Sequence, residues 1–77
     1  DLSMAHGALA RHAAASGRFA EAAERYATIL TLPDSAFGDG PAERRYHRGR
    51  AHNDFAAVLV ELGRTDDART HVEAALA

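Results

Sequence analysis

A six-residue pattern occurs twice in this chain, 46 residues apart, and it constrains the fold more than any other feature. The pattern first reads Gly17-Arg18-Phe19-Ala20-Glu21-Ala22 and then returns as Gly63-Arg64-Thr65-Asp66-Asp67-Ala68. Carried along the chain, the same offset pairs small residues with small ones and large residues with large ones, as Leu30 with Leu76. A repeated unit that cannot bury its own apolar face does so by stacking on the next unit.

Apolar residues recur at spacings of three and four in four segments, which is typical of amphipathic helices. We expect these helices over residues 3–15, 19–32, 41–62 and 65–77. Gly17 and Gly63 are natural helix ends, and Thr65 is placed to cap the last helix. Pro33 ends the second helix because the residue before a proline avoids the α region. Residues 33–41 hold both prolines and no periodic pattern, so we predict a loop there.

The whole chain, residues 1–77, is predicted to be a single all-α domain made of two antiparallel helical hairpins. The first repeat spans about residues 3–32, the loop residues 33–41, and the second repeat about residues 42–77. Nineteen residues are Ala and only seventeen apolar residues are larger, so the core must be thin and closely packed. The hairpins are expected to stack as a short α-solenoid, with a plain four-helix bundle as the alternative.

Composition and charge exclude several classes of protein. The chain has no Cys, which excludes disulfides, iron–sulfur clusters and thiolate zinc sites. A net charge of −2 gives no overall attraction to nucleic acids or anionic membranes. No apolar run approaches the roughly 20 residues of a membrane-spanning helix, and no signal-peptide pattern is present, so we expect a cytoplasmic protein. Abundant Ala and Arg without Lys is typical of a GC-rich gene, and we expect a piece of a longer bacterial protein.

The histidines do not form a pattern that predicts chemistry. His47 and His52 are five residues apart and His6 and His12 are six apart, whereas two ligands on one helical face need a spacing of four. No nucleophile motif or phosphate-binding glycine loop is present either. We therefore expect no catalytic residues, no metal site and no cofactor, and we interpret His6 and His52 as packing residues.

At the level of single positions the repeat resembles the tetratricopeptide repeat family, in about two degenerate copies. The pattern of the family's first helix falls on His6, Leu9, Ala10 and Ala13, and again on His52, Phe55, Ala56 and Leu59. The resemblance implies a set of residues that pack the repeats together: Leu9, Ala10, Ala22, Tyr26, Phe55, Ala56, Leu59, Ala68 and Val72. The chain departs from the family in its period of 46 residues, about 12 more than usual, which the loop and a lengthened third helix must absorb.

The resemblance also implies a binding groove, because the inner face of such arrays commonly binds peptides or helices of partner proteins. Here that face would present Met4, Gly7, Arg11, Arg50, Asn53, Ala57 and Val60. The family's clamp for a peptide C-terminus does not transfer, because Gly7 and Arg11 stand where its first Lys and Asn would be.

A basic patch is formed in the sequence by Arg44, Arg45 and Arg48, next to Arg50. Such a cluster beside a tyrosine could bind phosphates of RNA or DNA. Acidic residues surround it, however, so we consider nucleic acid unlikely and favour contact with an acidic protein segment.

The predicted function is that of a non-catalytic protein–protein interaction module within a larger regulatory or scaffold protein. It would bind a partner peptide or helix or mediate self-association. Two repeats make a short array. We therefore expect its ends to be covered either by neighbouring repeats of the parent chain or by a second copy, in a homodimer through Leu2, Leu76 and the outer helix faces. The alternatives are nucleic-acid binding through the basic patch and a purely structural dimerisation segment.

Overall fold

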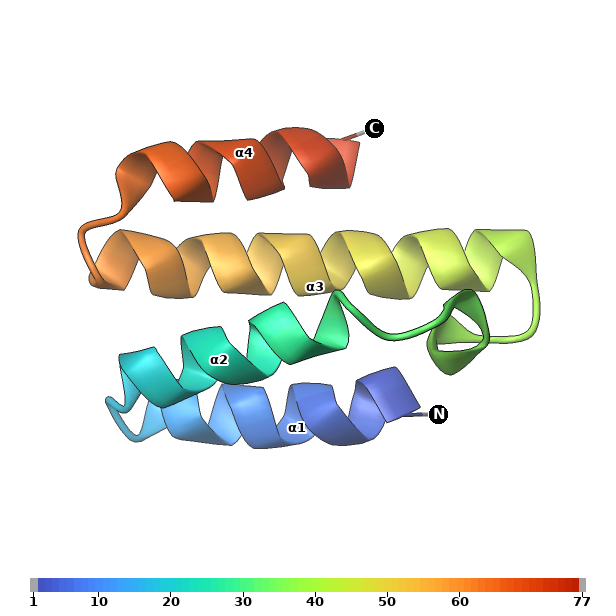
Figure 1. Cartoon of the computed structure of the whole chain (residues 1–77), viewed down its shortest axis with the longest axis horizontal. Helices are drawn as coiled ribbons and strands as arrows, with labels where there is room; N and C mark the ends of the chain where they lie inside the picture. The colour runs from blue at the N-terminus through green and yellow to red at the C-terminus, as the bar shows by residue number, and fades with distance from the viewer. Residues whose placement is uncertain (1, 77) are drawn as a thin grey trace.

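The computed structural model describes residues 2–76, with Leu2 described by its backbone alone, and within that range it is all helical (Figure 1). It contains α1 (Leu2–Ala15), α2 (Phe19–Ile29), the short 3-10 helix η1 (Asp34–Phe37), α3 (Pro41–Glu61) and α4 (Thr65–Leu76). The predicted all-α class is therefore confirmed. Among the described residues, no helix is both long enough and apolar enough to cross a membrane.

The four helices lie side by side in chain order, as Figure 1 shows. α1 packs on α2 and α3 packs on α4, which gives the two expected hairpins, and α2 joins the hairpins by packing on α3. Over the described residues α4 contacts neither α1 nor α2. The chain therefore forms an open array of 34 × 24 × 16 Å, not a closed four-helix bundle.

The turns of the two hairpins are built alike. Gly17 and Gly63 adopt positive φ values of 79° and 77°, which a glycine reaches at no steric cost. The next N–H in each turn, from Arg18 and Arg64, donates to the carbonyl five residues earlier, at 2.9 and 2.8 Å. These are the hydrogen bonds of a Schellman motif, so the repeat extends to the backbone geometry of the turns.

The start of α4 differs in one detail from the prediction. The carbonyl of Arg64 accepts the first helical hydrogen bond, from the N–H of Ala68, so the capping position falls one residue before Thr65. Arg64 also pairs with Asp67 at 2.9 Å, as Arg18 pairs with Glu21 at the start of α2. The expected cap at Thr65 is therefore wrong by one residue.

Small residues form the contact within the first hairpin. Ala10 and Ala13 of α1 and Ala22 of α2 are completely buried, which lets the two helices approach closely. Seven of the residues predicted to pack the repeats are buried in the core: Ala10, Ala22, Tyr26, Phe55, Ala56, Leu59 and Ala68.

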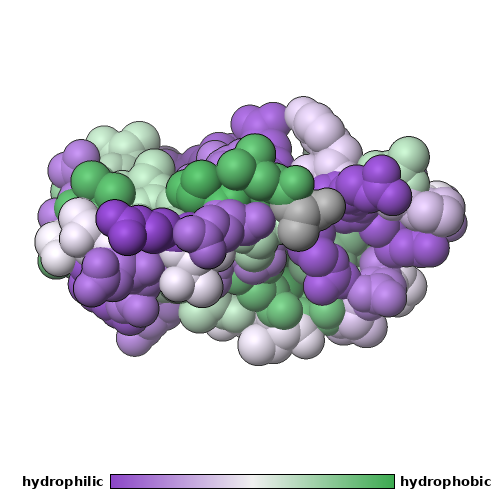
Figure 2. All heavy atoms as spheres, turned by 90° about the horizontal axis from the view of Figure 1, so that it is seen from above, coloured by the Kyte–Doolittle hydropathy of each residue, from purple (hydrophilic) through white to green (hydrophobic). Residues whose placement is uncertain are grey.

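Two of the predicted packing residues are exposed, and for these the prediction is wrong. Leu9 is 50% exposed because α1 buries Gly7 and Ala10 against its neighbours, and Leu9 lies about 100° around the helix from Ala10. Val72 is 39% exposed because, over the described residues, α4 packs on α3 alone and turns His71, about 100° around the helix from Val72, toward it. Figure 2 looks onto α4 and shows apolar side chains gathered on this outer surface.

The predicted loop contains structure that the sequence pattern did not reveal. α2 ends at Ile29 rather than Leu32, and η1 follows within the loop and packs on α1 and α3. Phe37 at the end of η1 is completely buried, and the guanidinium of Arg48 lies 4.4 Å from the centre of its ring. η1 thus covers the first turns of α3, which has 21 residues against 14 in α1.

Candidate partner-binding cleft

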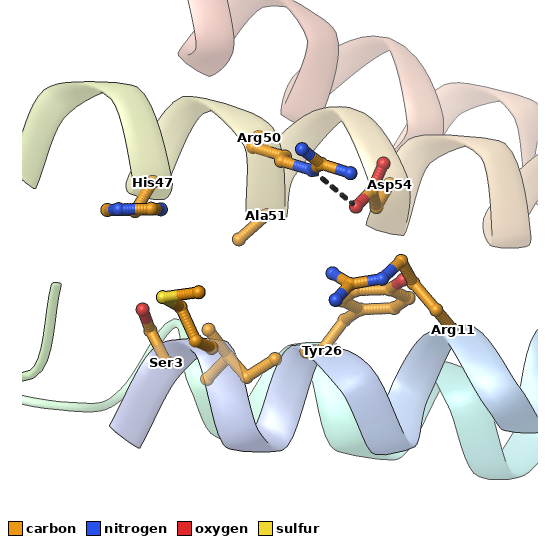
Figure 3. Close-up of a pocket in the computed structure, with 10 residues that line it drawn as sticks. Ser3, Arg11, Tyr26, His47, Arg50, Ala51 and Asp54 are labelled. Atoms are coloured by element: carbon orange, nitrogen blue, oxygen red, sulfur yellow. Dashed lines mark ion pairs between the residues drawn. The ribbon is translucent and has the colours of Figure 1, made fainter. Parts of the chain in front are cut away.

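A cleft of about 110 Å³ opens between α1 and α3 (Figure 3). Its lining residues come from three helices: Ser3, Met4, Gly7 and Arg11 from α1, Tyr26 and Ile29 from α2, and His47, Arg50, Ala51 and Asp54 from α3. Four residues of the predicted groove, Met4, Gly7, Arg11 and Arg50, are thus brought together here. The cleft is apolar along Met4, Ile29 and Ala51 and charged near Arg11, Arg50 and Asp54.

The α1 side of the cleft is shaped by the absence of a side chain at Gly7. A Cβ atom at this position would lie 3.1 Å from the terminal guanidinium nitrogen of Arg11, so the glycine leaves room for Arg11 to fold back along its helix. Figure 3 shows the Arg11 guanidinium across the ring of Tyr26, in the space between α1 and α3. Arg11 makes no hydrogen bond or ion pair with the residues that the structure describes. Its charge is therefore available to a ligand.

The α3 side of the cleft holds a second arginine, which has partners within the chain. The Nε atom of Arg50 lies 3.8 Å from a carboxylate oxygen of Asp54, and a terminal nitrogen donates to the hydroxyl of Tyr46 at 3.4 Å. The hydrogen bond to Tyr46 and the charge of Asp54 raise the pKa of Arg50 above its ordinary value. Arg50 is thus held in place as a permanent cation.

Tyr26 connects the cleft to the core. Its side chain is 2% exposed, and its ring stacks on Phe55 with the ring centres 6.1 Å apart. Burial raises the pKa of Tyr26, and Asp54 raises it further, while Arg11 and Arg50 act in the opposite direction. These groups therefore share one end of the cleft, where two guanidinium groups face a single carboxylate and an additional anionic group would be stabilised.

The predicted groove is not one continuous surface. Asn53 lies with Arg50 in a shallow depression between α3 and α4, which Arg45, Tyr46 and Ala75 also line. Ala57 and Val60 are exposed and lie outside both hollows. Ala57 and Val60 lie on the same side of α3 as Arg50 but about two and three turns nearer its C-terminal end, so both hollows end before them.

Sequence reasoning missed several residues that line the cleft. His47, Ala51 and Asp54 were missed; together with the predicted Arg50 they recur at spacings of three and four, so they share one face of α3. This spacing was available in the sequence. Ser3, Tyr26 and Ile29 carried no such signal, because their position in the cleft depends on how α2 crosses α1 and α3.

The basic patch does not form a free cationic surface. Arg44 donates to the backbone carbonyls of Gly38 and Asp39, at 3.4 and 3.1 Å. Arg48 pairs with Asp34 and covers Phe37. These two arginines hold the segment around η1 against α3, whereas Arg45 is exposed and has no ion pair with a described residue.

Two histidines meet between α3 and α4. The Nδ1 atoms of His52 and His71 are 2.9 Å apart, and the rings stack with their centres 5.1 Å apart. The ring of His71 also lies against Phe55, at 4.4 Å between centres. Burial, then the proximity of His71 and then that of Arg48 lower the pKa of His52. Among the described residues no group of three possible ligands could hold a metal ion.

The histidine pair predicts a loss of stability in mild acid. Because the pKa of His52 is lower in the folded chain than its ordinary value of about 6.5, protonation favours the unfolded chain. The free energy of unfolding should be highest above pH 6.5 and fall as the pH falls through the lowered pKa. Urea unfolding between pH 7.5 and 5.5 would measure this slope.

Two variants make the pH measurement specific. His52→Gln should flatten the slope, whereas His12→Gln, at an exposed position of α1, should leave it unchanged. A slope that persists in His52→Gln would contradict the assignment.

Comparisons with protein-family models, with curated proteins and with solved structures found no match to this chain.

Proposed function

We propose that the chain is a non-catalytic protein–protein interaction module of the tetratricopeptide type, and that a peptide or helix of a partner protein binds in the cleft between α1 and α3. The observation that carries the proposal is the position of Arg11. A cationic side chain without a partner among the described residues lines a cleft whose other wall is a second helix of the array. We place the module in a larger regulatory or scaffold protein of the bacterial cytoplasm.

The cleft defines the chemistry of the partner segment. An aliphatic side chain would lie against Met4, which is 56% exposed, and remove its apolar surface from water, with the buried Ile29 and Ala51 beneath it. A carboxylate two or more residues away in the partner segment would meet Arg11. A bidentate pair between a guanidinium and a carboxylate is strongest in a partly enclosed site such as this one. The segment is therefore expected to carry an acidic residue close to an aliphatic one.

The alternative of nucleic-acid binding has less support. It uses four arginines, Arg44, Arg45, Arg48 and Arg50. Arg44 and Arg48 are engaged with the segment around η1, and Arg50 is engaged with Asp54 and Tyr46. Phosphate binding at these positions would require the loss of those contacts.

Selection from a displayed library of random twelve-residue peptides tests the proposal. We expect the selected peptides to carry an acidic residue near an aliphatic one and to bind Arg11→Ala at least about tenfold more weakly, since a charged hydrogen bond contributes about 1.5–3 kcal/mol. Isothermal titration calorimetry would measure the dissociation constants.

Arg45→Ala is the matched control for this measurement, because it removes an exposed arginine outside the cleft. The Arg45→Ala variant should bind the selected peptides with the same affinity as the unchanged chain. Peptides that bind Arg11→Ala as tightly as the unchanged chain, or that lose affinity with Arg45→Ala alone, would overturn the proposal.

A further inference from the structure

Within residues 2–76, the helices at the two ends of the array each have no neighbouring helix on one side. α3 is covered by α2 on one side and by α4 on the other, whereas over the described residues α1 and α4 make no contact with each other. The outer sides of α1 and α4 therefore stay uncovered, at opposite ends of the array in Figure 1. Both outer sides carry exposed apolar residues.

The internal repeat identifies what these uncovered sides correspond to. On α2, the contact with α3 uses Tyr26, which stacks on Phe55. Leu30, directly after the end of α2, is partly buried against the same core. The offset of 46 residues carries Tyr26 and Leu30 onto Val72 and Leu76 of α4. Val72 is 39% exposed and Leu76 is 83% exposed. The outer side of α4 is thus the equivalent of a surface that is covered in the first repeat.

The other half of the α2–α3 contact lies on α3, and its equivalent in the repeat lies on α1. On α3 it consists of Phe55 and Ala51, both buried. The same offset, applied backwards, carries them onto Leu9 and Ala5, and both of these are exposed. Both halves of the α2–α3 contact therefore have an uncovered equivalent in the same chain. The equivalent of the α2 half lies on α4, and the equivalent of the α3 half lies on α1.

We propose that the outer side of α4 in one copy packs against the outer side of α1 in a second copy, so that the α2–α3 contact is repeated between chains. The inference goes beyond binding in the cleft, because Arg11 and Met4 take no part in it. Two different surfaces meet in this contact, which makes it heterologous, so assembly can continue from copy to copy.

Two departures from the repeat weaken this contact. Arg69 of α4 stands where α2 has Ala23, which is 8% exposed. Arg69 has no ion pair with a described residue, and packing a second copy over its guanidinium costs free energy. In addition Leu9 and Val72 replace the stacked pair of aromatic rings. The association is therefore weaker than the packing within the chain and depends on concentration.

Sedimentation velocity over a concentration series tests the proposal with two charged variants, Leu9→Glu and Val72→Glu. Each position is exposed in the single chain, so both variants should fold, which circular dichroism would verify. Each variant alone should remain monomeric, because every contact between identical copies needs both surfaces. An equal mixture should form dimers that do not grow further, since the intact α4 of one variant meets the intact α1 of the other.

Two further variants complete the experiment. Val60→Glu, at a position of α3 that is 53% exposed, should associate as the unchanged chain does. Arg69→Ala restores the small residue of the first repeat and should lower the concentration for half-association by about fivefold or more.

Three results would overturn the proposal. The first is a monomer at every concentration for both the unchanged chain and Arg69→Ala. The second is loss of association in Val72→Glu but not in Leu9→Glu, which would indicate a symmetric dimer through α4. The third is a mixture of the two charged variants that stays monomeric.

Discussion

Replacing Phe37 by Ala is expected to lower the free energy of unfolding by about 3–5 kcal/mol, the usual cost of deleting a buried aromatic ring. Phe37 is completely buried, and η1 contacts both α1 and α3. Its ring therefore holds the loop and the first turns of α3 against the rest of the array. A domain has about 5–15 kcal/mol of stability in total, so a large part would be lost. Urea unfolding followed by circular dichroism would measure the change.

Two control variants separate the contributions at this site. Phe37→Leu keeps most of the buried volume and should cost clearly less than the alanine change. Arg48→Gln removes the cation above the ring and the ion pair with Asp34. It should cost about 1 kcal/mol or less, because the charged groups of Arg48 and Asp34 lie at the surface. A cost for Arg48→Gln as large as that for Phe37→Ala would show that the ion pair, not the buried ring, holds the loop.

Enlarging Ala22 to Leu should destabilise the chain by about 1–3 kcal/mol, because a fully packed contact has no room for three more carbon atoms. Ala22 is completely buried, as is Ala10 in the neighbouring helix, and α1 packs directly on α2. The larger side chain would force the two helices apart. Thermal and urea unfolding would report the loss.

The chain provides a control and a duplicate for this substitution. Ala20→Leu makes the same change at an exposed position of α2, where little or no loss is expected. Ala68→Leu makes it at the equivalent position of the second hairpin, where Ala68 is 4% exposed and a loss in the same range is expected. Equal stability of Ala22→Leu and Ala20→Leu would contradict close packing between α1 and α2.

The sequence by itself determined the local structure and the repetition of the fold. Gly17 and Gly63 mark both hairpin turns because a positive φ value is a property of the residue and its immediate neighbours. An apolar period of 3.6 placed Ala10 and Ala22 on the apolar sides of their helices, and the resemblance to the tetratricopeptide repeat implied that both pack the repeats together. These signals operate over a few residues, so they can be read without knowing the tertiary structure.

Only the tertiary structure decided which neighbour covers each apolar side chain. Leu9 and Phe55 occupy equivalent positions, yet Leu9 is half exposed and Phe55 is buried, because α3 has helices on both sides and α1 does not. Phe37 stands in a segment without periodicity, and its burial follows from the space beside the long α3.

The cleft has the same origin. Arg11 and Asp54 lie 43 residues apart in the sequence and share one end of a cleft because α1 and α3 face each other across α2. Periodicity defines a face of one helix, whereas a binding site needs the relative position of several helices, which depends on packing between distant segments.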